Sequence, residues 1–357
     1  MSRNTTAQID LAAIRHNLSV VKNLAGDSRI VCVVKADAYG HGLSRVCRAL
    51  DDADVLAVAT TGEGFSCREQ GWAGRLLLLE GPSNAEEFDD AVTLGAEMVV
   101  HHESQLQLLA QRKISAPAAL WLKIDSGMHR LGFPPERATE VFKQLQQHCN
   151  GRPLILMSHF ACADDRNNPM TERQIRIFDA SVASLSGEMS LANSAAILNF
   201  PQSHRDYVRP GIMLYGVSPC TDRSAADIGL QPAMNLGCDL IAINQVSEGE
   251  SIGYGAGFIC PHDMLVGVAA IGYGDGYPRH AENGTPVLVN GQRAALTGRV
   301  SMDMITIDLT HLENAQVGDR VTLWGAGLPV EEVAQWANAI PYELICGVTA
   351  RVKAIMV

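Results

Sequence analysis

The sequence predicts a (β/α)8 barrel followed by a mostly β C-terminal domain, and three observations support this fold class. Eight short apolar runs alternate with amphipathic segments over about 220 residues. From about residue 230 the helical periodicity almost disappears, and strand-like runs follow one another between Gly and Pro turns. Apolar residues make up 47% of the 357 residues, enough for a packed core in each of two domains. We therefore expect a barrel domain over 1–230 and a β domain over 231–357.

The eight apolar runs are typical of parallel strands that are buried on both faces. They cover residues 29–35, 55–60, 75–81, 97–101, 119–125, 154–160, 189–194 and 211–216. The segments between them place apolar residues three and four positions apart, which predicts helices that cover a sheet. The clearest of these segments are 42–52, 84–95, 104–113, 136–149 and 171–185. Eight such units fit a closed barrel better than an open sheet.

The C-terminal part contains strand patterns with a single helical interruption. Strands are predicted at 238–246, 264–274, 285–291, 292–300, 304–309 and 319–325. The letters VNGQ at 289–292 lie between alternating residues and indicate a β-hairpin. A short helix is expected over 329–340, before a final segment, 342–357.

Composition excludes several classes of protein. With 39 acidic and 28 basic residues the net charge is −11, the wrong sign for a nucleic-acid binder. No apolar run approaches the roughly 18 residues of a membrane helix, and the N-terminus lacks the apolar segment of a secretory signal. The nine cysteines are odd in number and show no CxxC spacing, which argues against a disulfide scaffold or a metal site. We expect a cytoplasmic protein with no membrane, nucleic-acid or metal partner.

The ends of the predicted barrel strands carry the residues suited to chemistry, because function in such barrels lies at the carboxyl ends of the strands. Cationic and polar side chains gather there: Lys35, Arg130, His159, Ser194 and Arg209. This set suits an anionic ligand.

Lys35 is the most informative single residue. A lysine at a strand end often reaches out to solvent, and that is the simplest alternative. Inside a barrel mouth, however, loss of hydration favours the neutral and nucleophilic amine. Such an amine forms Schiff bases, and the cofactor that uses one together with a phosphate handle is pyridoxal phosphate.

Donors for a phosphate group can be found near two strand ends. Ser194 and the residues after it resemble the start of a helix, although a simple N-cap is the alternative for Ser194. Gly211 and Ile212 offer backbone amides near the eighth predicted strand, and Tyr39 offers a phenol in a helix-opening segment, 38–42.

These residues belong to a longer pattern. The string VVKADAYGHG at 33–42 resembles the cofactor-attachment segment of bacterial alanine racemases. The resemblance extends over nearly the whole chain, through LKIDSGMHRLGF, MSHFACAD, ANSAAI, DYVRPGIMLYG, AIGYGDGYPR and GRVSMDM. It implies a pyridoxal-phosphate enzyme with a barrel and a β domain that works as a head-to-tail homodimer with shared active sites.

The resemblance also implies a role for each residue. Lys35 would carry the cofactor as an internal aldimine, and alanine would react as an external aldimine. The phosphate would be held by Tyr39, Ser194, Gly211, Ile212 and Tyr342. His159 would lie beside the pyridine ring, Arg209 would face the pyridine nitrogen, and Arg130 and Met302 would contact the substrate. Tyr254 would enter from the other subunit, and Tyr273 and Asp303 would line the site. Taken alone, the Tyr and Met residues would be read as core packing.

The implied mechanism uses two bases. Lys35 would take the α-proton of D-alanine, and Tyr254, on the opposite face, that of L-alanine. A guanidinium at Arg209 cannot accept a proton, so the ring would stay neutral and transamination would be disfavoured. Lys123 lies beside these cations, and some family members carry a carbamate on the matching lysine, so we expect one here.

Three other classes stay open. A decarboxylase of basic amino acids has a related plan but needs an acid at the pyridine nitrogen and a Cys-containing motif that this chain lacks. A broad-specificity amino-acid racemase shares the mechanism. A non-catalytic pyridoxal-phosphate carrier would lack the domain that bears Tyr254. The sequence leaves open whether the enzyme supplies D-alanine for peptidoglycan or degrades alanine. Two positions depart from many family members, Asp37 in place of Asn and Ser301 in place of Cys.

Overall fold

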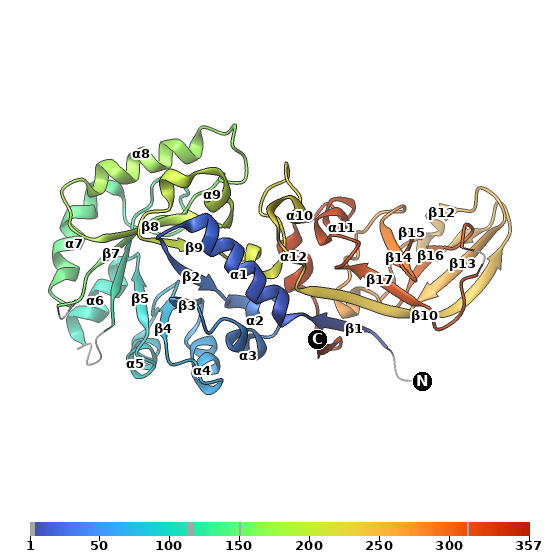
Figure 1. Cartoon of the computed structure of the whole chain (residues 1–357), viewed down its shortest axis with the longest axis horizontal. Helices are drawn as coiled ribbons and strands as arrows, with labels where there is room; N and C mark the ends of the chain where they lie inside the picture. Colours follow the sequence, from blue (N-terminus) through green and yellow to red (C-terminus); the bar gives the residue numbers. More distant parts are fainter. Residues whose placement is uncertain (1–3, 113–117, 150, 313) are drawn as a thin grey trace.

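The computed structural model describes residues 4–112, 118–149, 151–312 and 314–357. The chain forms two domains that lie side by side along its long axis, a barrel and a β domain (Figure 1). The long strand β10 (Met234–Val246) leads from the junction into the β domain.

Eight parallel strands close the barrel in sequence order, from β2 to β9. They are β2 (Arg29–Val33), β3 (Val55–Val58), β4 (Arg75–Leu78), β5 (Glu97–Val100), β6 (Leu120–Lys123), β7 (Ile155–Met157), β8 (Glu188–Asn193) and β9 (Tyr207–Arg209). Most strand residues are fully buried, as both-face apolar runs require. The predicted barrel is therefore confirmed.

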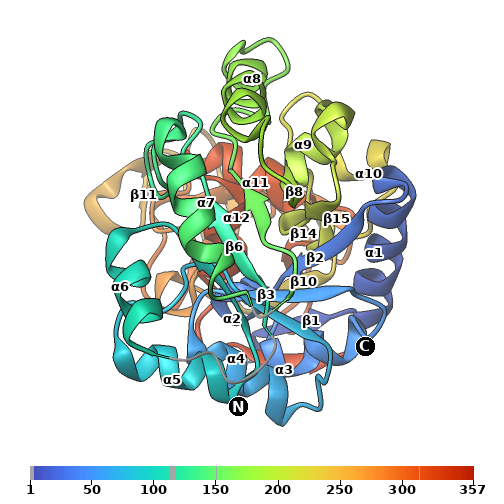
Figure 2. The same cartoon turned by 90° about the vertical axis from the view of Figure 1, so that its left-hand side faces the viewer.

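Helices surround the ring of strands, as the view along the barrel makes plain (Figure 2). They are α1 (Leu11–Ala25), α3 (Leu43–Val46), α4 (Thr61–Glu69), α5 (Ala85–Thr93), α6 (Glu103–Gln111), α7 (Ala138–Gln146), α8 (Met170–Val182) and α9 (Ser194–Asn199). The last residue of the predicted helix over 104–113 lies outside the described residues. Side-chain caps start several of these helices; Asp10, for example, accepts from Ala13 N at 2.9 Å.

The eighth strand differs from the prediction. The run 211–216 was expected to be a strand, but Ile212–Tyr215 forms a one-turn helix and the strand is β9, just before it. All four residues of that turn are buried. A short run that is buried throughout has the same apolar pattern in a strand and in a helical turn, so its periodicity does not distinguish the two. Because the strand ends at Arg209, Gly211 lies in the loop at the mouth of the barrel and Ile212 begins the one-turn helix there.

The second domain is built on one mixed sheet of eight strands, in the order β13-β16-β15-β14-β17-β10-β1-β18. The strands other than β10 are β1 (Thr6–Ile9), β13 (Met264–Ala269), β14 (Pro286–Val289), β15 (Gln292–Thr297), β16 (Ile305–Asp308), β17 (Arg320–Trp324) and β18 (Lys353–Met356). Strand β1 pairs with β10 and β18, although the predicted division placed residues 1–230 in the barrel domain. The first strand of the chain thus fastens the barrel to the second domain.

Smaller elements complete the β domain. They are the two-stranded pair β11 (Ser251–Ile252) and β12 (Phe258–Ile259), and the helices α11 (Val330–Trp336) and α12 (Pro341–Cys346). The hairpin expected at 289–292 is confirmed, because Val289 faces Gln292 and both turn residues, Asn290 and Gly291, have positive φ.

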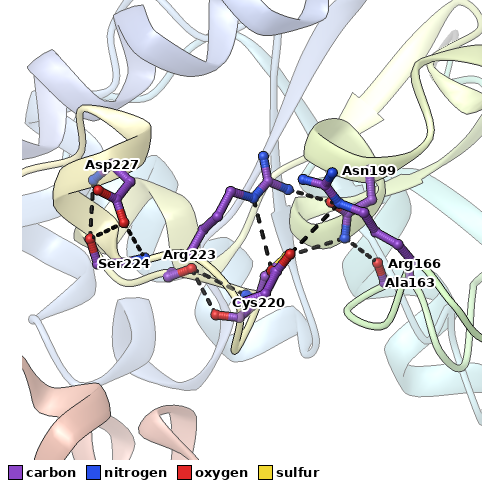
Figure 3. A network of polar contacts seen from close by, with 9 residues as sticks. Ala163, Arg166, Asn199, Cys220, Arg223, Ser224 and Asp227 are labelled. Atoms are coloured by element: carbon purple, nitrogen blue, oxygen red, sulfur yellow. Dashed lines mark hydrogen bonds and ion pairs between the residues drawn. The ribbon is translucent and has the colours of Figure 1, made fainter.

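The linker between the domains is tied to the barrel by Asn199, at the end of α9 (Figure 3). Its Nδ2 donates to Ala163 O at 2.8 Å and to Cys220 Sγ at 3.3 Å. Its Oδ1 accepts from Arg166 Nε at 2.8 Å and from Arg223. One amide therefore holds the loop after β7 against the linker that leads through α10 (Ala225–Ile228).

In the described part of the chain, no helix combines the length and the apolar character needed to cross a bilayer.

Candidate active site

A cavity of about 400 Å³ lies at the carboxyl ends of the barrel strands. Ten residues predicted for the site line it together: Lys35, Tyr39, Lys123, Arg130, His159, Ser194, Arg209, Gly211, Ile212 and Tyr342. The remaining lining consists of residues that the prediction did not assign: Val33, Leu79, Glu80, Leu131, Met157 and Asn193. Their only sequence signal is their place at or just after the strand ends.

Lys35 follows the end of β2 and opens α2 (Lys35–Tyr39). This element was expected to open an ordinary helix over 38–42, but Ala36, Asp37, Ala38 and Tyr39 all have φ between 51° and 54°, so it is a left-handed turn. A carboxylate holds its start, because Glu63 Oε1 accepts from Ala36 N at 2.7 Å. The turn directs both Lys35 and Tyr39 to the cavity.

The end of the cavity suited to phosphate is crowded by backbone and hydroxyl groups. Asn193, rather than Ser194, caps α9, since its side chain accepts from Ala196 N at 3.0 Å. The Ser194 hydroxyl instead accepts from Gly211 N at 2.9 Å. A Cβ on Gly211 would lie 2.4 Å from the Tyr39 hydroxyl, so only glycine allows the loop and the phenol to approach in this way.

The aromatic rings behind this end are packed against one another. Tyr39 stacks on Tyr215 with ring centroids 4.8 Å apart and lies 6.0 Å from Tyr342. Burial raises the pKa of each of these three phenols above its ordinary value, so all three stay protonated and able to donate at neutral pH.

Arg209 lies at the centre of the barrel mouth and is 4% exposed. It donates to neutral groups: to Ser190 Oγ and Ser158 O at 2.7 Å, and to Leu191 O and His159 Nδ1 at 3.2 Å. Burial lowers its pKa to about 10, which still leaves the guanidinium charged at neutral pH. The donation from Arg209 requires a bare Nδ1 on His159. The pKa of His159 lies well below its ordinary value through burial and then the nearby Arg209, so this imidazole is neutral.

Arg130 extends from a loop that Asp125 organises. The Asp125 carboxylate accepts from Gly127 N at 2.9 Å, from His129 N at 3.0 Å and from His129 Nδ1 at 3.1 Å. On the strand before it, Lys123 is 8% exposed, and its pKa falls to about 8 through burial and then the charges of Arg209, Arg130 and Lys35. The mouth of the barrel is therefore strongly cationic.

Four predicted site residues lie elsewhere, on loops of the β domain: Tyr254, Tyr273, Met302 and Asp303. They do not line the cavity formed by this chain's described residues. Tyr254 is 70% exposed and lies between two glycines of positive φ, Gly253 and Gly255. Tyr273 N donates to Ser301 O at 3.0 Å, which places Tyr273 beside the loop of Met302 and Asp303. Tyr273, Met302 and Asp303 thus lie on two neighbouring loops, and neither these residues nor Tyr254 line the barrel cavity.

Comparison with known proteins identifies the architecture. The N-terminal domain of alanine racemases matches residues 9–219, and the C-terminal domain of alanine racemases matches residues 233–356. A Pseudomonas aeruginosa protein named alanine racemase, biosynthetic, is 49% identical over 351 residues, 98% of either chain. A Vibrio vulnificus alanine racemase is 48% identical over 349 residues, again 98% of either chain.

Solved structures agree with this. The biosynthetic alanine racemase of Pseudomonas aeruginosa superposes with a TM-score of 0.97 at 48% identity, covering 99% of both chains. An alanine racemase from Bartonella henselae, described with covalently bound pyridoxal phosphate, has a TM-score of 0.89 at 27% identity and covers 99% of both chains. On sequence and on fold, over nearly its full length, the chain belongs to the alanine racemase family.

Proposed function

We propose that this protein interconverts L-alanine and D-alanine with pyridoxal phosphate as its cofactor. The observation that carries this proposal is one cavity with a lysine amine on one strand end and a cradle of hydroxyl and amide groups on two others. The relatives named alanine racemase, one of them biosynthetic, support this substrate and a role in supplying D-alanine.

The residues present fit a pyridoxal phosphate molecule. The cradle of Tyr39, Ser194 and Gly211 leaves no room for a Cβ, as expected where a backbone must approach a phosphate closely. Arg209 offers only donors to the cavity, which suits an unprotonated ring nitrogen. Bound at Lys35 through a Schiff base, pyridoxal phosphate would delocalise the electron pair left at Cα when the α-proton departs.

The chain's own groups then divide the work. Once the substrate amine has displaced Lys35 from the cofactor, the freed Lys35 Nζ would take the proton from Cα of D-alanine, and the Tyr254 hydroxyl would take it from L-alanine on the opposite face. Arg130 and Met302 contact the substrate, and Arg130 pairs with its carboxylate. His159 and Arg209, which share a hydrogen bond at the cavity wall, would hold the cofactor ring in position. Because Arg209 donates and cannot give the ring nitrogen a readily shared proton, an unprotonated ring would draw less of the electron pair away from Cα, which favours return of the proton there.

The proposed second base requires a second chain. Tyr254, Tyr273, Met302 and Asp303 lie on loops that do not line this chain's cavity, and three of them are large apolar side chains exposed by 70%, 40% and 52% for Tyr254, Tyr273 and Met302. We therefore assign these loops to the cavity of a partner subunit, in a homodimer with two shared sites. The buried thiols of Cys32, Cys47 and Cys67 fit a reducing compartment, which supports a cytoplasmic location.

A racemisation screen tests the proposal directly. Purified protein with added pyridoxal phosphate is incubated with each amino acid, and the enantiomers are separated by chiral chromatography. We expect alanine to react fastest by far. Activity spread evenly over many amino acids would point to a broad-specificity racemase, and no activity on alanine would refute the proposal.

Borohydride reduction tests the attachment residue. Reduction should abolish the visible absorbance band of the Schiff base and leave the reduced label on the peptide that carries Lys35. A label on Lys22, Lys113 or Lys123 would refute the assignment.

A further inference from the structure

The left-handed turn after Lys35 is the most unusual piece of backbone in the molecule. Of nine non-glycine residues with positive φ in the described part of the chain, four are consecutive and lie here, from Ala36 to Tyr39. A left-handed conformation brings each Cβ close to the following carbonyl, so ordinary residues adopt it only when their surroundings impose it. The groups that impose it therefore decide where Lys35 and Tyr39 point.

Three of these groups can be identified around the turn. The Glu63 carboxylate takes the amide of Ala36, and the Asp37 carboxylate takes the amide of Leu43 at 2.6 Å. Gly40 lies so close to α12 that a Cβ there would meet Ile345 O at 2.2 Å. Backbone amides hold its interior, since Gly40 N donates to Ala36 O at 3.0 Å, Gly42 N to Asp37 O at 2.9 Å and His41 N to Ala38 O at 3.1 Å.

The side chain of His41 adds a donor at the carbonyls of Ala38 and Tyr39, where the turn ends. Its Nδ1 lies 3.1 Å from Ala38 O and 2.9 Å from Tyr39 O. Both neighbours are acceptors, so Nδ1 must carry the proton. The ring is 1% exposed and packs against Tyr215, with centroids 4.6 Å apart, on the same ring that stacks against Tyr39.

The other nitrogen of this imidazole supports the same protonation state. Nε2 is buried and has no hydrogen-bond partner among the described residues. A protonated Nε2 would leave a donor unsatisfied there, and burial lowers the pKa of His41 to about 4. A neutral imidazole with its proton on Nδ1 is thus the form that the surroundings accept.

We propose that His41 is a positioning residue for the cofactor. Its Nδ1–H donates to the carbonyls of Ala38 and Tyr39 and so stabilises the left-handed turn that places the Tyr39 hydroxyl against the loop of Gly211. The Tyr39 hydroxyl lies against Gly211 in that loop, so a change in the turn is transmitted directly to the cradle. The inference rests on the proposed function, since the cradle matters only if it binds a phosphate.

Two amide variants separate the clamp from general packing. In His41→Asn the side-chain amide lies where Nδ1 was and keeps a donor for the two carbonyls. In His41→Gln the amide reaches instead to the place of Nε2 and leaves the carbonyls without that donor. Both variants lose the same ring contact with Tyr215. Pyridoxal phosphate affinity is measured by titrating each apoprotein and following the visible Schiff-base band, together with KM for alanine at saturating cofactor and the melting temperature of the apoprotein.

We expect His41→Asn to bind pyridoxal phosphate within about threefold of the wild type, and His41→Gln about tenfold more weakly. KM for alanine should stay within about twofold in both, because His41 does not line the cavity. Tyr207→Phe is the matched control for lost stability. It removes two partly buried hydrogen bonds, one donated to Glu188 and one accepted from Arg75, at the start of β9 and so at the far end of that strand from Arg209 and the cavity. It should lower the melting temperature and leave cofactor affinity unchanged.

The outcomes are distinct. Equal cofactor affinity of the Asn and Gln variants, or loss of affinity in Tyr207→Phe that matches its loss of stability, would overturn the role of His41. Failure of the wild type to bind pyridoxal phosphate at all would instead overturn the proposed function.

Discussion

A single added methyl at Gly211 should weaken cofactor binding through Tyr39. The Cβ of Gly211→Ala would lie 2.4 Å from the Tyr39 hydroxyl and 3.1 Å from its ring carbon Cζ. Gly211 has φ of −120°, outside the left-handed region, so the effect of the methyl is steric. Tyr39 has little room to retreat, because its ring is stacked against Tyr215. The hydroxyl must therefore move by roughly 1 Å to restore an ordinary contact.

The expected magnitude follows from the bond that this movement breaks. A hydrogen bond to a charged group is worth about 1.5–3 kcal/mol, which corresponds to about a tenfold to hundredfold rise in the Kd of pyridoxal phosphate. Tyr39→Phe removes the same bond and should weaken binding by a similar factor. In the double variant the methyl occupies the space of the missing hydroxyl, so we expect its Kd to be close to that of Tyr39→Phe alone.

The assay is titration of four apoproteins with pyridoxal phosphate, followed by the Schiff-base absorbance. The four are the wild type, Gly211→Ala, Tyr39→Phe and the double variant. Gly62→Ala is the control, since it adds the same methyl on an exposed part of α4 where the nearest atom is 3.9 Å away, and it should leave Kd unchanged. Additive losses in the double variant would refute the reasoning, because the two changes would then act through different contacts.

Three further predictions concern subunits, acid and modification. An inactive Lys35→Ala chain mixed with an inactive Tyr254→Phe chain should recover about a quarter of wild-type activity, because about half of the dimers are then heterodimers and one of the two sites in each is intact; no recovery despite subunit exchange would contradict the shared site. The pKa of His41 drops from 6.5 in the unfolded chain to about 4 through burial, so the unfolded state binds more protons between these values. The free energy of unfolding, measured by urea denaturation, should therefore fall by about 2 kcal/mol between about pH 7.5 and about pH 5 because of His41. His41→Asn should lack this contribution to the pH dependence. Lys123, with a pKa lowered to about 8, should carry a carbamate detectable in a high-resolution crystal structure, whereas an ammonium paired with its own carboxylate would contradict this.

Most of the barrel could be predicted because strands that are buried on both faces are continuous apolar runs in the sequence. Seven of the eight apolar runs contain the strands at their expected places, and the exception is instructive. Strand β9 is three residues long and ends in a charged arginine, so it has almost no apolar run. The neighbouring run, 211–216, is the stronger signal, yet its buried residues belong to a one-turn helix. A short apolar run predicts that its residues are buried, but it does not predict whether they form a strand or a helix.

The local form of the site could not be predicted in the same way. Nothing in Ala36, Asp37, Ala38 and Tyr39 favours a left-handed turn, and intrinsic preference opposes it. The turn depends on partners distant in sequence, Glu63 on α4 and Ile345 on α12. The places of Lys35 and Tyr39 along the chain, together with the family resemblance, predicted both as site residues without their geometry, and His41 had no assigned role until its contacts with the turn were visible.

Charge at the barrel mouth connects the sequence and the site. Lys123 has its pKa lowered first by burial and then by three cations, while Asp125 opposes them only as the smallest of the five influences. A fold that needed these groups for stability would pair each with an anion, since buried like charges repel one another. Arg209 follows the same pattern, because every partner described above is neutral. A phosphate and a carboxylate would bring negative charge to these groups, so the repulsion that the protein tolerates becomes attraction for its ligands. Cations at strand ends are informative in a sequence for this reason: a cluster of them that few carboxylates offset suits anionic ligands.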